Sequence, residues 1–182
     1  MNFNFKNKKT IIISVVCILL LITIILSIYF VNKNNSTPTV LTSNDNSFKI
    51  SIPGQIKFER KDTSSLDIFS EKDEMILSTT VMEKQRDIDL NSIAKLEMAG
   101  LSSLKQNLDN LSDLSKIELK GYEAYKYSYT YYDKDYQSDF YTEIVWIKTE
   151  KNIYVLDCEV ITKNQEKYKT LFNEIINSFE EI

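Results

Sequence analysis

The feature of the sequence that most constrains its fold is an uncharged run near the N-terminus, IIISVVCILLLITIILSIYFV at 11–31. An α-helix rises about 1.5 Å per residue, so a helix of this length spans roughly 30 Å, the thickness of the hydrocarbon core of a bilayer. We therefore expect residues 10–31 to form a single transmembrane helix in contact with the lipid bilayer. The rest of the chain must then fold as a separate body at the membrane.

The lysines on either side of this predicted anchor set its orientation. Lys6, Lys8 and Lys9 precede it, whereas Lys33 alone follows it closely. Because short segments rich in Lys stay in the cytoplasm, the asymmetry predicts a cytoplasmic N-terminus at 1–9 and a C-terminal part outside the cell membrane. A cleaved signal peptide would have a shorter apolar core and a cleavage site with small residues. The sequence favours an uncleaved anchor over a cleaved signal peptide and leaves occasional cleavage open.

The sequence beyond the anchor divides into a linker and one domain. Residues 32–47 are polar and rich in Asn, Ser and Thr, which predicts a flexible linker. Residues 48–182 have the length of a single extracytoplasmic domain with its own core. Residues 1–44 hold four of the 22 basic residues and none of the 26 acidic ones, so the remainder has 18 basic and 26 acidic residues and a net charge of −8. An acidic domain is repelled by nucleic acid, which we exclude as a partner.

Residue types that usually carry catalysis and metal binding are scarce. The chain has no histidine, and its two cysteines, Cys17 in the predicted anchor and Cys158 in the domain, cannot pair with each other. The segment that begins at Asp133 resembles the start of a calcium loop, but Ser138 and Ile144 stand where such a loop needs Gly and Glu. We therefore expect a protein that is not an enzyme, with no catalytic residues, no metal site and no cofactor.

Hydrophobic periodicity predicts an ordered series of strands and helices in the domain. Helical spacing of apolar residues predicts helices at 89–108 and 165–180. Strands are predicted at 48–52, 56–60, 66–70, 75–82, 115–119, 122–132, 139–148 and 153–162. Because hairpin-length turns join most neighbouring strands, we expect an α+β fold, with a mostly antiparallel sheet packed against two helices.

Three short motifs carry a resemblance to a known family. They are an opening strand that ends in Ile-Pro at Phe48–Pro53, a Gly-Tyr-Glu-Ala strand entry at Gly121–Ala124, and a terminal helix that closes with Ile-Ile-Asn-Ser-Phe at Ile175–Phe179. With the order of the elements, they make the domain similar to the PsbP-like superfamily. The resemblance implies an α/β/α sandwich and a non-enzymatic binding or assembly module, and it supplies no catalytic residues.

One face of the predicted sheet is a candidate ligand-binding site. If Ile147 pairs with Ile153, then Glu143 lies directly opposite Asp157, and the tyrosines that alternate along 122–132 lie on the same face. Rings and carboxylates together would suit a cation, a peptide or a glycan. A register error of one residue would disperse this face, leaving an ordinary half-buried sheet. The predicted site comprises Tyr125, Tyr127, Tyr129, Tyr141, Glu143, Asp157 and Glu159.

These observations lead to two functional hypotheses. The first is a single-pass membrane protein whose outer domain binds a protein partner at the cell envelope, in an assembly, sensing or immunity role. The alternative is a ligand-binding surface module that uses the tyrosine and carboxylate face. A wide, flat apolar patch on the domain would favour the first hypothesis, and a closed pocket with convergent tyrosines and carboxylates would favour the second.

Overall fold

The computed structural model describes residues 16, 18–24, 26–27, 37–61, 65–84, 89–105 and 107–182, and the chain divides into two units, Met1–Thr37 and Pro38–Ile182. In the first unit, residues 18–24 are helical, and the hydroxyl of Thr23 donates to the carbonyl oxygen of Leu20 at 2.8 Å. No helix among the described residues is long and apolar enough to cross a membrane. The anchor predicted at 10–31 lies largely outside the described residues and stays a prediction.

The second unit is built on an antiparallel sheet of seven strands, in the order β3-β4-β5-β9-β8-β7-β6. Strand β8 lies near the middle of this sheet and is buried on both faces over most of its length, which explains its nearly continuous apolar sequence. The strands are β3 (Glu59–Lys61), β4 (Asp67–Ser70), β5 (Met75–Glu83), β6 (Ser115–Leu119), β7 (Tyr122–Asp133), β8 (Ser138–Lys148) and β9 (Asn152–Ile161).

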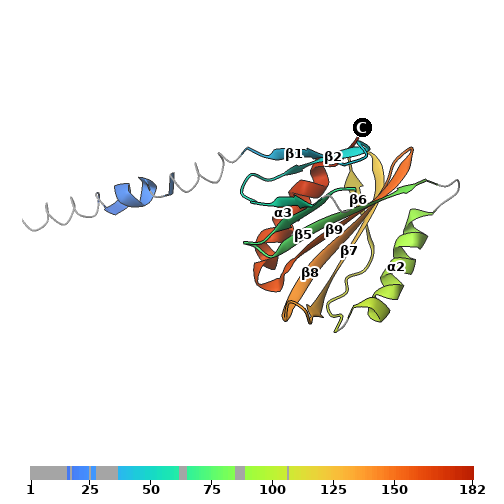
Figure 1. The fold of residues 1–182 in the computed structure, drawn as a ribbon. Coiled ribbons are helices and arrows are strands. Elements are labelled where there is room, and N and C mark those ends of the chain that lie inside the picture. The colour runs from blue at the N-terminus through green and yellow to red at the C-terminus, as the bar shows by residue number, and fades with distance from the viewer. Residues whose placement is uncertain are drawn as a thin grey trace, which may run out of the picture. The chain divides into compact units, whose positions relative to one another are not determined.

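Helix α2 (Leu90–Leu104) covers one face of the sheet, and Figure 1 shows it on the side opposite α3. The carboxylate of Asp89 caps the helix by accepting a hydrogen bond from the backbone N–H of Ser92 at 3.2 Å. Buried side chains of α2 recur at Leu90, Ala94 and Leu101, which form the stripe that packs on the sheet.

Helix α3 (Gln165–Ser178) covers the other face, together with a small second sheet (Figure 1). A short 3-10 helix, η1 (Thr162–Asn164), leads from β9 into α3. The second sheet has the order β1-β2-β10 and consists of β1 (Thr39–Thr42), β2 (Phe48–Ile52) and β10 (Glu180–Glu181). The rings of Phe48, Tyr154 and Phe179 lie 5.0 to 5.6 Å apart and join the two sheets. The result is a sandwich of helix, sheet and helix.

The predicted α+β class and the mostly antiparallel sheet with two packed helices are confirmed. The strand predicted at 48–52 and the one at 115–119 have the predicted bounds, and α3 ends two residues before the predicted end. The structure differs at 32–47, where Thr39–Thr42 of the predicted linker form β1, paired with β2. This strand has a weak sequence signal, because only Val40 and Leu41 are apolar there and both lie among turn-forming residues.

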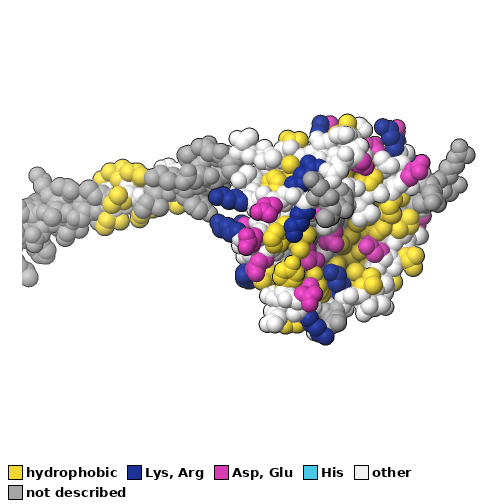
Figure 2. Space-filling view, viewed as in Figure 1, with side chains coloured by type: hydrophobic (Ala, Val, Ile, Leu, Met, Phe, Trp, Pro, Cys, Tyr) yellow, Lys and Arg dark blue, Asp and Glu magenta, His cyan; other side chains and the backbone are white. Residues whose placement is uncertain are grey.

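The surface of the domain mixes charges of both signs. Figure 2 shows Lys and Arg side chains interspersed with Asp and Glu side chains on the face that it displays. The ion pairs of the domain include Lys163 with Glu74 at 2.7 Å and Lys167 with Asp73 at 2.9 Å. On this face, the acidic balance of the sequence is not gathered into a single patch.

Candidate functional site

The register of the β8–β9 hairpin decides where the predicted site residues lie. Ile147 pairs with Tyr154, one residue away from the predicted partner Ile153. The turn is tied by the backbone N–H of Thr149, which donates to the carbonyl oxygen of Asn152 at 3.0 Å. Because side chains alternate between faces, this shift of one residue places Glu143 and Asp157 on opposite faces of the sheet. The predicted Glu143–Asp157 pair is therefore wrong.

Five of the seven predicted site residues share the face beneath α2. They come from β7 and β9, and two of them, Tyr127 and Tyr129, are almost completely buried. The hydroxyl of Tyr127 donates to the carboxylate of Glu97 on α2 at 2.9 Å. With α2 in this position, the face is mainly an interior surface of the domain, contrary to the open face that the sequence suggested. The five residues are Tyr125, Tyr127, Tyr129, Asp157 and Glu159.

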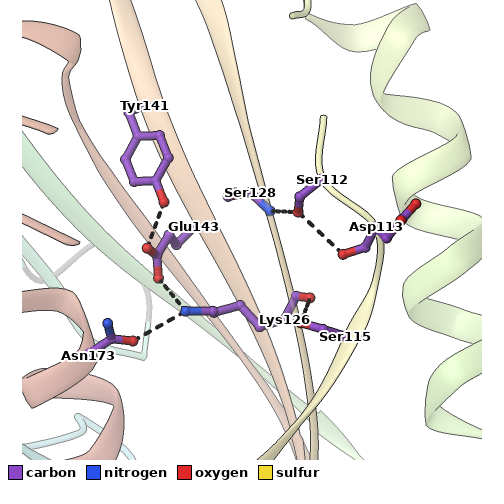
Figure 3. Close-up of polar contacts among 8 residues, drawn as sticks. All are labelled: Ser112, Asp113, Ser115, Lys126, Ser128, Tyr141, Glu143 and Asn173. Carbon is purple, nitrogen blue, oxygen red and sulfur yellow. Dashed lines mark hydrogen bonds and ion pairs between the residues drawn. The ribbon is translucent and has the colours of Figure 1, made fainter. Parts of the chain in front are cut away.

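The remaining two predicted residues, Tyr141 and Glu143, lie on the α3 side of the sheet, in a network that the sequence did not reveal (Figure 3). Glu143 is only 3% exposed and accepts two hydrogen bonds. One comes from the hydroxyl of Tyr141 at 2.7 Å, and the other from the ammonium of Lys126 at 3.2 Å. Lys126 also donates to Asn173 of α3 at 3.2 Å, so the network ties the helix to the sheet.

Burial and nearby carboxylates raise the pKa values of Tyr141, within this network, and of Cys158, beside it. Burial raises the pKa of the Tyr141 phenol, and its hydrogen bond to the Glu143 carboxylate raises it further. Burial, and then the nearby carboxylates of Glu143 and Asp157, raise the pKa of the Cys158 thiol well above its ordinary value. Cys158 is therefore held as a neutral, fully buried thiol, and nucleophilic chemistry, which needs the thiolate, is not favoured there.

A polar cleft of about 710 Å³ opens beside this network, between α3 and the β7–β8 hairpin. Tyr141 belongs to both the cleft and the network, and the ammonium of Lys169 lies 5.3 Å from the centroid of its ring. Amides and hydroxyls dominate the lining, with two carboxylates, one ammonium and a single aliphatic side chain. We call this site the α3 cleft, and its lining residues are Asn107, Leu108, Asp109, Asn110, Ser128, Thr130, Tyr131, Asp139, Tyr141, Thr162, Gln165 and Lys169.

The outer wall of the α3 cleft is a segment without regular structure. Asp109 and Thr130 exchange backbone hydrogen bonds of 2.8 Å, and the backbone N–H of Ser112 donates to the carbonyl oxygen of Ser128 at 2.9 Å. Figure 3 shows Ser112 and Ser128 in contact, since the Ser112 hydroxyl also accepts from the backbone N–H of Ser128. This wall has no periodic signal in the sequence, because it pairs with β7 through an isolated bridge at Asp109 and Thr130.

The segment that resembles a calcium loop forms the β7–β8 turn. The carboxylate of Asp133 accepts the backbone N–H groups of Asp135 and Tyr136 at 2.8 and 3.1 Å, which closes the turn on itself. Within the described part of the chain, no group of three or more His, Cys, Asp or Glu side chains could hold a metal ion.

Comparison with known proteins bears on the fold. No protein-family model matches the sequence, and no curated protein matches it significantly. Two similar solved structures are LpqN of Mycobacterium tuberculosis, described as involved in cell envelope biogenesis, and the cyanobacterial PsbP (CyanoP) of Synechocystis. LpqN is 14% identical with a TM-score of 0.58, and the alignment covers 84% of this chain and 94% of LpqN.

The cyanobacterial PsbP is 11% identical with a TM-score of 0.61, and its alignment covers 81% of this chain and 94% of that protein. At these identities the similarity shows the fold alone. The resemblance to the PsbP-like superfamily that the sequence motifs indicated is confirmed at this level: the domain has the fold of PsbP.

Proposed function

We propose that this chain is a single-pass membrane protein whose outer domain binds a protein partner at the cell envelope and catalyses no reaction. Residues 10–31 would cross the bilayer, with 1–9 in the cytoplasm and 48–182 outside. The Lys asymmetry around the apolar run supports this topology. The described large apolar side chains at 16–26 are about half exposed, and lipid would cover them. The similar fold of LpqN, a protein involved in cell envelope biogenesis, supports this location.

The observation that carries the binding role is the α3 cleft, a polar pocket that also suits the ligand-binding alternative. The preference for a protein partner rests on the main-chain-like hydrogen bonding that the cleft lining offers. The cleft volume of about 710 Å³ falls within the range of roughly 300–1,000 Å³ that is typical of ligand sites. Amide and hydroxyl groups such as those of Gln165, Ser128 and Asn107 both donate and accept hydrogen bonds, as the main chain of a bound protein segment requires. The buried Glu143–Lys126 pair holds Tyr141 in place at the cleft, so this part of the wall is fixed before binding.

Site-specific photo-cross-linking in native membranes tests this role. A photoreactive residue at Gln165 or at the exposed Asp139 should give one discrete adduct with a protein partner, because both side chains line the α3 cleft. The matched control is Lys95, which is exposed on α2 at the other face of the sheet. Adducts from Lys95 alone, or none from any of the three positions, would argue against partner binding in the cleft.

The second candidate function is binding of a hydroxyl-rich ligand such as a glycan in the same cleft. The near absence of aliphatic lining, with Leu108 as the exception, favours such a ligand over an apolar one. The full chain, in a detergent without a sugar head group, should then melt at a higher temperature when soluble envelope glycans are added. Asp139→Asn and Gln165→Ala should reduce that shift, whereas Lys95→Ala should leave it unchanged.

The topology has its own test. Protease added to intact spheroplasts should digest an epitope at the C-terminus and leave one at the N-terminus protected, since the domain is expected outside. Lysed spheroplasts serve as the control, in which both epitopes are digested. Protection of the C-terminal epitope with loss of the N-terminal one would reverse the proposed orientation.

A further inference from the structure

Three carboxyl groups converge in the space between α2 and the sheet. Glu97 comes from α2, whereas Asp157 and Glu159 come from β9 and point to the same side. Two of the three have clear partners. Glu97 accepts from the hydroxyl of Tyr127 and from the indole N–H of Trp146, both at 2.9 Å. Glu159 accepts from the hydroxyl of Tyr131 at 2.7 Å.

Asp157 differs from its neighbours because its Oδ1 atom is buried and has no hydrogen-bond partner. The register places it between Ile144 of β8 and Ser78 of β5, which bring no charge. The charged and titratable groups that act on it are Glu97 and Lys105 at α2, Glu159 on its own strand, and Tyr127 and Tyr129 on β7. A carboxylate with one oxygen buried and unpaired is unfavourable, so the packed arrangement favours a neutral, protonated Asp157.

Ionisation of Asp157 would act on the contact between α2 and the sheet. Within the described residues, the helix is held by three buried side chains, by the partly buried Ile93 and Met98, and by two polar attachments. One attachment is Glu97, with its bonds to Tyr127 and Trp146. The other is Lys105, whose ammonium lies 3.8 Å from the Glu159 carboxylate and 3.9 Å from the centroid of the Tyr131 ring. A negative charge at Asp157 would repel Glu97 and weaken the first of these attachments.

We propose that Asp157 makes the contact between α2 and the sheet sensitive to pH, so that ionisation of its carboxyl group loosens the helix. Loosening would give solvent access to the face of the sheet beneath α2, which carries Tyr125, Tyr127 and Tyr129. The domain would then have a closed form at acidic pH and a more open form at neutral and alkaline pH. This inference concerns the α2 side of the sheet and does not rest on the function proposed for the α3 cleft, although Tyr131 borders both regions.

The direction of the pH dependence follows from linkage. Burial, and then the charges of Glu159 and Glu97, raise the pKa of Asp157 to about 7, with Lys105 opposing them. In an opened form, the carboxyl regains an ordinary pKa near 3.8. Opening therefore releases a proton and becomes more favourable as the pH rises. The equilibrium constant for opening should grow by up to about tenfold per pH unit below pH 7 and level off above it.

Hydrogen exchange of the full chain in detergent micelles tests the proposal. After normalisation to the chemical exchange rate at each pH, exchange of the α2 amides should rise by about 10- to 100-fold from pH 5 to pH 7. Amides of α3, on the other face of the sheet, should change little. The Asp157→Asn variant should lose the pH dependence in α2, and Asp135→Asn, at an exposed position in the β7–β8 turn, should retain it.

Fluorescence gives a second readout that needs no variant, because Trp146 is the single tryptophan and its indole N–H contacts α2 through Glu97. Its emission should move to longer wavelength over the same pH range as the exchange. A flat pH profile of α2 exchange in the wild-type chain would overturn the proposal. So would a rise shared equally by α2 and α3, since that would show titration of global unfolding.

Discussion

Replacing Phe172 with alanine should lower the free energy of unfolding of the domain by about 3–5 kcal/mol, the usual cost of deleting a fully buried aromatic side chain. Phe172 is completely buried in the middle of α3, and its ring lies 5.5 Å from that of Tyr168. The helix covers the sheet and β2 at this point, so the cavity left by the ring has little room to collapse.

Denaturant unfolding of a soluble fragment of residues 38–182, which includes β1 and the described core, measures this effect. Asn177→Ala on the exposed side of the same helix is the matched control and should stay within about 0.5 kcal/mol of the wild type. A loss of less than about 1 kcal/mol for Phe172→Ala would show that α3 does not bury this side chain as described.

Lys126→Met should destabilise the same fragment by about 2–4 kcal/mol, because it leaves the Glu143 carboxylate buried without a cation. Methionine keeps most of the apolar stem, so the change isolates the charge. The side chain of Lys126 is 24% exposed, which places the expected loss slightly below that of a fully buried pair. Lys49→Met, which breaks the exposed ion pair with Glu180, should cost less than about 1 kcal/mol.

Adding Glu143→Gln to the Lys126→Met variant should recover part of the lost stability, since the unpaired charge is then gone. Alone, Glu143→Gln should destabilise, because it weakens the bonds from Tyr141 and Lys126. This is opposite to the effect expected if Glu143 faced Asp157. Stabilisation by the single Gln change would contradict the ion pair in Figure 3.

Most of the fold was predictable because its main elements have strong periodicity. The apolar positions of α3, from Tyr168 to Ile176, repeat with helical spacing, and the long strands β7 to β9 are bounded by clear turns. The strands that were missed are short and polar. Strand β1 has four residues and β10 only two, and each forms because β2 offers an edge for pairing. Their existence depends on a tertiary neighbour that local sequence does not encode.

The site was less predictable because it depends on register and on distant segments. The turn after Lys148 could close with either of two pairings, and the hydrophobic pattern did not decide between them, since β8 is apolar on both faces. Lys126 did carry a signal. It is the only basic residue within β7, and it alternates with the tyrosines, so it had to lie on the opposite face. The α3 cleft needs residues from 107 to 169, which only the folded chain brings together.

The small sheet also determines when the domain can finish folding. Strand β2, near the start of the domain, pairs with β10 at Glu180 and Glu181, and Phe48 stacks on Phe179 at 5.6 Å. Strand β5 likewise pairs with β9 over nine residues. Strands β2 and β5 therefore each lack one of their two neighbours until the segment from β9 to β10 has been synthesised. Pairing between segments so far apart in the sequence carries a high loop-closure cost, so native structure should form late and slowly compared with a domain built from local hairpins alone.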